Sequence, residues 1–505
     1  MKSFEVISNP ATVLIKDIPV LDYAEFSEQT LKCLKQPNLH CVNYFVQKEK
    51  GNYRFFMLIA DDNMHSFHVY IHEQDSVVKK LESLAAVHFP LHVFEREIHE
   101  NYGFEFTNHP WLKPLRFPQN RFDSSQEMKD YPFYKIESEE LHEVGVGPIH
   151  AGIIEPGHFR FLCNGEKVLH LEIQLGYQHR GVENLFIQKR KLLQQSILAE
   201  SIAGDTAAGH GLAFVQLIEA LAAKGDAPLK LQIERIIALE MERMAIHIGD
   251  TAALCGDVAY QLGQAGCEAL RTLVINSMQD WCGNRFGKGL MRPGGTNYPL
   301  SKNTNQTILS RLDEVHKRFL QLTDCIYTSP GILSRFEKTG TITGKQAGLT
   351  GAVGMAARMA GVHRDIRTSH PFQYYRTMSY DPVILESGDV FSRGILRQHE
   401  VDLSFGVIKK LFKFHEGLEG SLIKKPDYDL KLNPGSLGIS LTEGWRGEIC
   451  HTCITDENGS IVHYKIKDPS MHNWLVLALA VREQEISDFP VCNKSFNLSY
   501  CGHDL

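Results

Sequence analysis

The sequence predicts an α+β fold, in which a small N-terminal α/β domain precedes a mainly helical bundle domain with β-strands at its periphery. The first hundred residues alternate short strand patterns with polar turns, whereas the chain beyond residue 145 repeats apolar side chains at the spacing of long helices. A polar, aromatic stretch of low periodicity separates the two. We therefore predict a domain over residues 1–115, a linker over 116–144 and a second domain over 145–505.

The N-terminal domain is expected to combine strands with short helices. Tyr53–Ala60 and Ser66–His72 are rich in aromatic and β-branched residues, which favours strands. Residues 76–86 carry apolar side chains at helical spacing. A charged helical turn that begins at Phe94 is stopped by Gly103 and soon followed by a proline, a pattern typical of a docking element.

The second domain is expected to be built from long helices. Apolar residues recur at i, i+3, i+4 and i+7 over residues 183–223, 231–255, 257–281 and 305–327. Helices of this length bury their apolar faces by packing into a bundle. The sequence therefore predicts a helical bundle as the main body of the chain.

Strands are predicted at the ends of this bundle. Val146–Cys163 and Lys167–Ile173 have strand-like composition. Further on, Gly447–Thr455 and Ser460–Ile466 flank Asp456–Gly459, whose Asn-Gly step favours a tight hairpin turn.

Composition excludes several classes of function. The 505 residues are 43% hydrophobic and 22% charged, which is ordinary for a globular chain with more than one core. A net charge of −7 and a pI near 6.4 leave no basic footprint, so we expect no nucleic-acid partner. The longest apolar run, Trp474–Val481, is too short to span a bilayer, and the first ten residues lack an export segment. Eleven scattered cysteines are typical of reduced thiols, so we expect a cytoplasmic chain that reaches a membrane through partners.

Two local patterns suggest chemistry that their context does not support. Cys450 and Cys453 form a Cys-x-x-Cys pair, but they lie in a predicted strand without a second pair to complete a four-ligand site. Gly348–Gly354 is rich in glycine but lacks the strand–loop–helix context of a dinucleotide site. We expect neither to bind a metal or a nucleotide.

The segment Phe94–Leu112 resembles the signature of the small hydrophilic subunit of complex I, the C or 30-kilodalton type. It carries Glu-Arg-Glu from Glu95, an aromatic-Gly turn ending at Gly103, and His-Pro-x-Leu from His109. The resemblance implies that this segment docks the domain on a larger neighbour and is not catalytic.

The chain from about residue 145 resembles the complex I D-type subunit and the large subunit of group 4 nickel–iron hydrogenases of the formate hydrogenlyase and hydrogenase-4 kind. The match is carried by an ordered set of short blocks. These are Gly147–His150, Glu155–Arg160, Tyr177–Glu183, Glu242–His247, Gly283–Phe286, Arg292–Gly295, Gly361–Arg367 with His370-Pro371, Gly388–Arg393 and Trp445–Glu448. The resemblance implies a fused C-plus-D subunit with a hydrogenase-large-subunit-like second domain.

The hydrogenases of this family hold their metals with two Cys-x-x-Cys pairs, because nickel and low-spin iron require soft thiolate ligands. At the matching positions this chain has Ala203 and Thr206, then Leu498 and Cys501. Cys501 is thus the only surviving position of the four. The resemblance therefore implies that the nickel–iron ligands are lost, and we expect no metal and no cofactor bound by this chain.

The resemblance also implies roles around the former metal cavity. Glu155 matches a glutamate that relays protons, and a buried carboxylate suits that role. His210 follows the first cysteine-pair position, and Arg446 matches an arginine that lies over the iron's diatomic ligands. Asp205 is a further carboxylate in the same loop. We predict that Glu155, His210, Arg446 and Cys501 line one cavity; the alternative is a filled, polar but inert core.

A second group of residues matches the family's contact with the electron-entry [4Fe–4S] cluster of a partner subunit. His179, Arg180 and Glu183 form the His-Arg-Gly-x-Glu element beside that cluster, and His247 matches a histidine that donates toward it. A cation there stabilises the reduced cluster. The alternatives are an ion-pair motif at a helix start and, for His247, a satisfied interior histidine.

Quinone is an alternative substrate of this cavity, as in complex I. The tyrosine of the quinone site would fall near Gly204, its histidine near Glu155 or Gly157, and an arginine at Ser201, but none of them is present. The family also implies a small iron–sulfur subunit and antiporter-like membrane subunits as partners, at the cytoplasmic face of the inner membrane.

Three hypotheses therefore compete. The first is a subunit of an NADH dehydrogenase-like or hydrogenase-like oxidoreductase with an altered acceptor, which couples electron transfer to ion translocation. The second is a non-redox scaffold that transmits conformation. The third, a working hydrogenase, is the least consistent with a single thiol.

Overall fold

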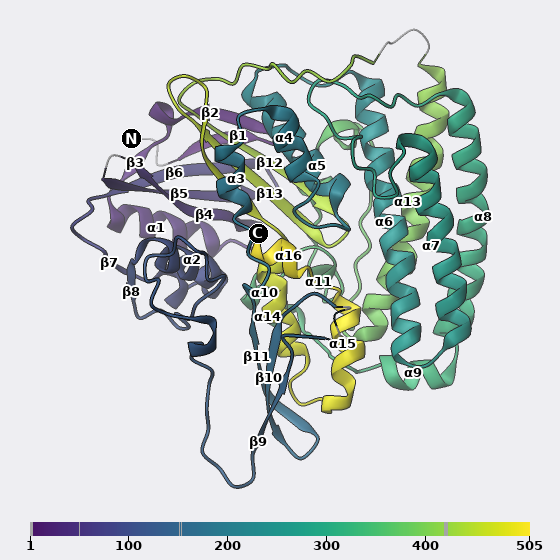
Figure 1. Ribbon diagram of the computed structural model, residues 1–505, viewed down its shortest axis with the longest axis horizontal. Coiled ribbons are helices and arrows are strands. Elements are labelled where there is room, and N and C mark those ends of the chain that lie inside the picture. The colour runs from purple at the N-terminus through teal and green to yellow at the C-terminus, as the bar shows by residue number, and fades with distance from the viewer. Residues whose placement is uncertain (1–3, 50, 151, 153, 419–422) are drawn as a thin grey trace.

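The N-terminal part of the chain forms a sheet covered on one face by two helices. The computed structural model describes residues 4–49, 51–150, 152, 154–418 and 423–505. The strand order is β1–β6–β5–β4, with β3 pairing in parallel with β6. The strands span Glu5–Ser8 (β1), Val20–Leu21 (β3), Leu39–Glu49 (β4), Asn52–Asp61 (β5) and Ser66–Gln74 (β6), and the helices span Tyr23–Leu34 (α1) and His92–Tyr102 (α2) (Figure 1).

Alternation along β5 explains why both faces of this sheet are buried. Phe55 and Met57 belong to the core under α1 and α2, whereas Phe56 and Leu58 belong to the main core of the chain. Successive side chains of a strand point to opposite faces, so one strand serves both cores. The sheet is thereby a shared wall between the two regions.

In this region the predicted strands are confirmed, but the helix predicted over residues 76–86 is not. β5 and β6 confirm the two predicted strands, and Gly103 ends α2 in the left-handed conformation with φ of 72°. The helix predicted over 76–86 is wrong. That stretch contains β7 (Lys80–Glu82), which pairs in parallel with β8 (Glu105–Thr107), because a tertiary strand partner outweighs a weak helical period.

A second sheet combines strands from both ends of the chain. β14 (Ile461–Lys467), β13 (Gly447–Thr455) and β12 (Ser436–Gly444) follow one another, and β2 (Ala11–Leu14) adds to the free edge of β12. The hairpin predicted around Asp456–Gly459 is confirmed. An N-terminal strand therefore completes the C-terminal sheet.

A third, smaller sheet projects at the lower edge of the view in Figure 1. It consists of β9 (His142–Val146), β10 (His158–Asn164) and β11 (Lys167–Gln174). The single strand predicted over Val146–Cys163 is wrong, because the chain turns away after β9 and returns as β10. Ala151 and Ile153, within that prediction, lie outside the described residues.

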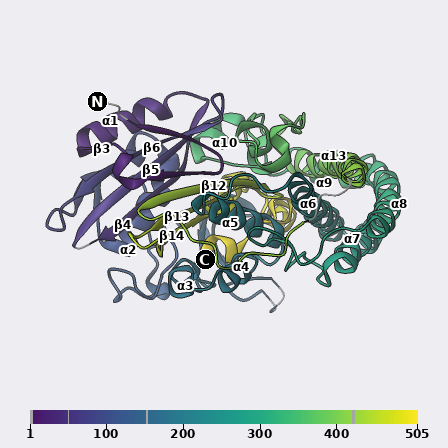
Figure 2. The same ribbon diagram turned by 90° about the horizontal axis from the view of Figure 1, so that it is seen from above.

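Four long helices form the bundle. α6 (Leu229–Asp257), α7 (Gln261–Cys282) and α8 (Lys302–Tyr327) agree with the predictions, and α13 (Val390–Gly417) packs against α6 and α8. α5 (Ala207–Leu221) lies between this bundle and the sheet of β12–β14 (Figure 2).

The helix predicted over 183–223 is wrong as a single element, because the charged run at 189–191 and the loop at 200–206 interrupt it. The pieces are α3 (Val182–Gln188), α4 (Leu192–Ala199) and α5. The remaining short helices are α9 (Pro330–Phe336), α10 (Gly344–Thr350), α11 (Met355–Arg358), α12 (Ile366–Ser369), α14 (Ser470–Ala480), α15 (Phe489–Phe496) and α16 (Tyr500–Asp504). Single 3₁₀ turns occupy Ile15–Asp17, Leu84–Ala86, Phe89–Leu91, Met128–Asp130, Gln373–Arg376 and Ile486–Asp488.

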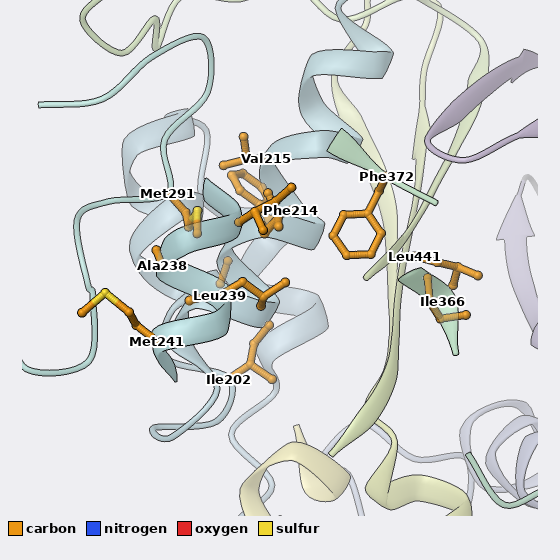
Figure 3. Close-up of a cluster of buried hydrophobic side chains, with 14 of the residues drawn as sticks. Ile202, Phe214, Val215, Ala238, Leu239, Met241, Met291, Ile366, Phe372 and Leu441 are labelled. Carbon is orange, nitrogen blue, oxygen red and sulfur yellow. The ribbon is translucent and has the colours of Figure 1, made fainter. Parts of the chain in front are cut away.

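The main core lies where α5, α6 and the C-terminal sheet meet. Phe214 and Val215 of α5 approach Leu239 of α6 on one side, and Phe372 and Leu441 lie on the other (Figure 3). Over the described ranges of the chain, no helix combines the length and apolarity that a bilayer crossing requires.

Candidate functional site

The loop between α4 and α5 presents its residues at the N-terminal end of α5. Glu242 of α6 accepts hydrogen bonds there from the backbone nitrogens of Ala208 (2.6 Å) and Gly209 (3.1 Å). The first N–H groups of a helix have no partner within it, so Glu242 supplies a cap from a neighbouring helix. Burial raises the pKa of Glu242 to about 8, which keeps the carboxyl mostly protonated at neutral pH.

Arg446 and Asp205 form the ion pair at the centre of this region. Arg446 Nη1 and Nη2 donate to the two carboxylate oxygens of Asp205, each at 2.7 Å, and Nη1 also donates to Thr206 Oγ1 at 3.1 Å. Trp445 Nε1 donates to the backbone oxygen of Asp205 at 2.9 Å, and the guanidinium lies 3.9 Å from the Trp445 ring centroid. Burial alone would disfavour the charge, but Asp205 offsets this and raises the pKa of Arg446.

Glu155, in the loop that precedes β10, lies beside Cys501 of the C-terminal turn. Cys501 Sγ lies 3.4 Å from Ser499 Oγ, and Arg446 Nε donates to the backbone oxygen of Asn497 at 2.6 Å, so this turn adjoins the ion pair. Burial, followed by the proximity of Glu155, raises the pKa of Cys501 to about 11. The sulfur is therefore a neutral thiol at neutral pH.

His210 is fully buried and joins the site through Asp468. His210 Nε2 lies 3.1 Å from Asp468 Oδ2, and His210 Nδ1 lies 3.0 Å from His451 Nε2. Asp468 is close enough to Arg446 for the guanidinium to contribute to lowering the pKa of this carboxyl. The sequence prediction omitted His451 and Asp468, because no local pattern in the Cys450–Cys453 stretch indicates that its histidine meets another one.

The residues expected at a partner's cluster separate into two environments. Arg180 is exposed, and its guanidinium donates to the backbone oxygens of Ser201 (2.8 Å), Ile202 (2.7 Å) and Cys501 (3.2 Å). His179 Nδ1 lies 2.8 Å from the backbone oxygen of Asp504. Arg180 thus places a positive charge on the surface beside the loop that follows α4.

Glu183 has an internal role. Its carboxylate accepts from Lys465 Nζ at 3.0 Å and from the backbone nitrogen of Ile466 at 2.9 Å, which ties the first turn of α3 to β14. It therefore fixes the helix that follows His179 and Arg180.

His247 lies in the interior. Its Nε2 lies 2.7 Å from Glu400 Oε2, and its side chain has no exposed surface. Burial lowers its pKa, so the ring is neutral at neutral pH. A direct hydrogen bond to a partner's cluster is not available in this conformation, although the ring edge faces Trp445 at a centroid distance of 6.0 Å.

The sequence prediction did not identify the buried ionic network around Glu400. Arg358 Nη2 and Arg367 Nη2 donate to Glu400 Oε1 at 2.6 and 2.9 Å, and both arginines also bind Asp365. Arg243 donates to the backbone oxygens of Glu443 (2.8 Å) and Gly444 (3.1 Å). The network therefore holds the turn that carries Trp445 and Arg446. Several of these residues lie in the blocks at Glu242–His247 and Gly361–Arg367, but their convergence depends on the tertiary fold.

The side chains at the four positions that match the family's cysteine pairs do not fit a nickel–iron centre. Ala203, Thr206 and Leu498 offer no thiolate, which leaves Cys501 as the one sulfur donor among these four positions. Among the described residues, no three or more His, Cys, Asp or Glu side chains gather in a way that could hold a metal ion.

Two family patterns match successive parts of the chain. The pattern described as "Respiratory-chain NADH dehydrogenase, 30 Kd subunit" matches residues 22–136, and the one described as "Respiratory-chain NADH dehydrogenase, 49 Kd subunit" matches residues 267–436. The chain is 26% identical to the carbon monoxide-induced hydrogenase of Rhodospirillum rubrum, over 70% of this chain and 97% of that protein. It is 25% identical to the D-type subunit of the NADH-quinone oxidoreductase of Clostridium beijerinckii, over 67% of this chain and 90% of that protein.

A solved structure shares the fold. A chain of the membrane-bound sulfane sulfur reductase, an archaeal respiratory membrane complex, superposes with a TM-score of 0.67 at 19% identity, over 74% of this chain and all of that one. The two patterns occur here in one polypeptide, in the order 30 kDa then 49 kDa. The chain therefore belongs to the family of fused complex I C/D-type subunits, whose relatives are group 4 hydrogenase large subunits and D-type subunits of NADH-quinone oxidoreductases.

Proposed function

We propose that this chain is the cytoplasmic-side large subunit of a membrane-bound oxidoreductase complex, and that it couples electron transfer to ion translocation without a nickel–iron centre. The observation that carries the proposal is the presence of Ala203, Thr206 and Leu498 at three positions where the resemblance implies thiolates, beside a two-point ion pair between Arg446 and Asp205. The scaffold and a charged site are retained while the metal donors are not.

The proposed partners are a small subunit with a [4Fe–4S] cluster and antiporter-like membrane subunits. Arg180 supports the first, because its exposed guanidinium lies at the surface next to Ser201, Ile202 and the turn of Cys501. A fixed positive charge stabilises the reduced form of a nearby cluster. The proposed electron acceptor is a small molecule in the Arg446–Asp205 region, with a quinone as one candidate.

The decisive experiment is anaerobic purification of the intact complex, with metal analysis, spectroscopy of its clusters and ion uptake into vesicles. We expect no stoichiometric nickel, a reducible cluster and ion uptake that depends on an electron donor and acceptor. Stoichiometric nickel or hydrogen uptake would refute the proposal. A reducible cluster without turnover of any acceptor would favour the scaffold hypothesis instead.

Replacing Arg180 by methionine tests its electrostatic role toward the partner's cluster. The substitution removes the charge and keeps most of the side-chain bulk, so we expect the cluster's reduction potential to fall. Arg190→Met is the matched control, because Arg190 is an exposed cation near the start of α4. An unchanged potential in Arg180→Met, with the complex still assembled, would assign Arg180 a structural role.

His247→Met tests the second expected cluster residue. His247 is neutral and bonded to Glu400, so its effect would act through the interior. If His247 titrates with reduction of the cluster, the variant flattens the dependence of the potential on pH. The same pH dependence in wild type and variant would restrict His247 to the buried network.

A further inference from the structure

Four buried side chains form an unbranched hydrogen-bonded row next to the site. Tyr464 Oη lies 2.8 Å from His451 Nδ1, His451 Nε2 lies 3.0 Å from His210 Nδ1, and His210 Nε2 lies 3.1 Å from Asp468 Oδ2. None of the four residues is more than 1% exposed. Each ring nitrogen has one partner, so the row is continuous from a phenol to a carboxylate.

With one proton on each imidazole, the ionised carboxylate of Asp468 fixes the direction of every hydrogen bond. Ionised Asp468 accepts, so His210 carries its proton on Nε2 and accepts through Nδ1. His451 must then donate from Nε2 and accept through Nδ1 from the hydroxyl of Tyr464. Burial, reinforced by His210, lowers the pKa of His451, and burial raises that of Tyr464, so both remain neutral. Burial opposes ionisation of Asp468, but His210 and Arg446 lower its pKa.

The Asp468 end reaches the turn that carries Cys501. Asp468 Oδ2 lies so close to Gly502 that a Cβ there would be 2.6 Å away. The hydroxyl of Ser499 accepts from the nitrogen of Gly502 at 2.8 Å and lies 3.4 Å from Cys501 Sγ. Arg446 is the cation that faces Asp468. This end therefore belongs to the candidate site.

The Tyr464 end adjoins a separate cavity. Tyr464 is one of the residues that line a cavity of about 430 Å³ between the 30 kDa-type region and the segments of α3 and β14, together with Glu97, Arg116, His179 and Glu183. Its charged and polar lining suits water. Cys450, Cys453 and Glu183 are the other titratable groups that face Tyr464.

We propose that Tyr464, His451, His210 and Asp468 form a proton-transfer chain that carries a proton from this cavity toward the Cys501–Arg446 site when negative charge arrives there. The arrival of charge rests on the proposed electron-transfer function. The O–H bond of Tyr464 breaks as an N–H bond forms at His451 Nδ1. His451 Nε2 passes its proton to His210 Nδ1, and His210 Nε2 passes its own to Asp468. One proton moves overall and no residue is oxidised or reduced. A hydronium ion that enters the cavity from bulk solvent returns a proton to Tyr464 and is left as water.

Electron transfer in the purified complex, measured against pH and in heavy water, tests the proposal. Tyr464→Phe and His451→Gln interrupt the row and are expected to slow turnover of the acceptor by about 100-fold, with an altered solvent isotope effect and an unchanged cluster potential. Tyr375→Phe is the matched control, because it removes a buried hydroxyl that donates to Glu240 at 2.6 Å, away from the row. Wild-type rates and isotope effects in both row variants would overturn the proposal.

A second measurement does not depend on redox activity. Nitrogen-15 spectra of the histidine-labelled full chain report which ring nitrogen carries the proton. We expect protons on Nε2 of both His210 and His451, and Asp468→Asn should change the signals of His451 as well as those of His210. His451 signals that are unchanged in Asp468→Asn would overturn the proposed proton-transfer chain. A coupled response in a complex without electron transfer would support the chain and reject the proposed function.

Discussion

The ion pair between Asp205 and Arg446 joins a partly exposed carboxylate to a guanidinium that is almost fully buried, with side-chain exposures of 34% and 4%. Asp205→Asn leaves that guanidinium with a neutral partner. We expect the free energy of unfolding to fall by about 1–3 kcal/mol, because a buried charge loses its counter-ion.

A double-mutant cycle with Arg446→Met, followed by urea unfolding of the full chain, isolates this pair. Removing both charges should cost less than the sum of the single substitutions. Strictly additive effects would show that the two side chains do not stabilise each other.

Glu242 gives a prediction about pH. Its folded-state pKa of about 8 lies above the ordinary value of 4.5, so the folded chain binds more protons than the unfolded chain between these values. The stabilisation from this group is complete below about pH 4.5 and is lost as the pH rises through about 8. Glu242→Gln mimics the protonated form, so its unfolding free energy should decline less than that of the wild type between pH 5 and 8.

Glu240→Gln is the control for that measurement. Burial opposes ionisation of Glu240, but Arg243 and Arg367 lower its pKa, so it stays ionised throughout the range from pH 5 to 8. The variant should lose stability by the same amount at every pH in this range. Parallel curves for wild type and Glu242→Gln would contradict the assignment of the raised pKa.

Resemblance identified individual residues better than it identified their partners. Asp205, Arg446, Glu155 and Cys501 were expected in one region, and the contacts of this region link Asp205 to Arg446 and Glu155 to Cys501. Asp468 could not be found from sequence, because its role follows from a hydrogen bond across 258 residues. The interior position of His247 depends on helix packing in the same way.

At the scale of elements, two loops meet without side chains between them. Gly354 precedes α11 with φ of 60°, and a Cβ there would lie 2.1 Å from Gly447 Cα, within the turn that follows Arg446. Gly354→Ala combines backbone strain with a backbone clash, so we expect a loss of about 2 kcal/mol or more in urea unfolding.

Gly348→Ala is the matched substitution in the same glycine-rich stretch. Gly348 lies within α10, and a Cβ there meets open space, so alanine should be neutral or stabilise by about 0.5 kcal/mol. Equal stabilities of the two variants would show that the backbone at Gly447 moves to accommodate the added Cβ at little cost.

Helical spacing of apolar residues that continues over more than twenty residues predicted α6, α7 and α8, because each of these helices keeps an apolar face against the bundle. The same signal joined α3, α4 and α5 into one element, because apolar spacing continues across the breaks. The loop that contains Gly204 and Asp205 interrupts the helix and places Asp205 against Arg446. The conformation of the short stretch at 76–86 depends on the pairing of β7 with β8, which the local sequence does not encode.

At the scale of the whole molecule, contacts between the two regions run through the interior. His40 Nε2 lies 2.8 Å from Glu448 Oε2, and Lys465 Nζ donates to Glu97 at 2.5 Å. A protease site inserted after Ser125, in an exposed stretch, should therefore yield two fragments that co-elute in size-exclusion chromatography and separate only in denaturant. Fragments that separate in native buffer would show that the covalent connection holds the regions together.

The pairing of β2 with β12 also implies a delay between the synthesis of the two strands. Leu14 lies opposite Ser436 and Ala11 opposite Ile439, so the two strands are more than 420 residues apart. At ribosomal speeds of about 5–20 residues per second, β2 waits roughly 20–85 s after its own synthesis before its partner exists. During that interval the backbone N–H and C=O groups of β2 lack their native strand partner. An unpaired strand of this kind can pair with another chain and aggregate. Fusion of the two regions keeps the waiting strand on the same polypeptide as its partner, so the final encounter is independent of protein concentration.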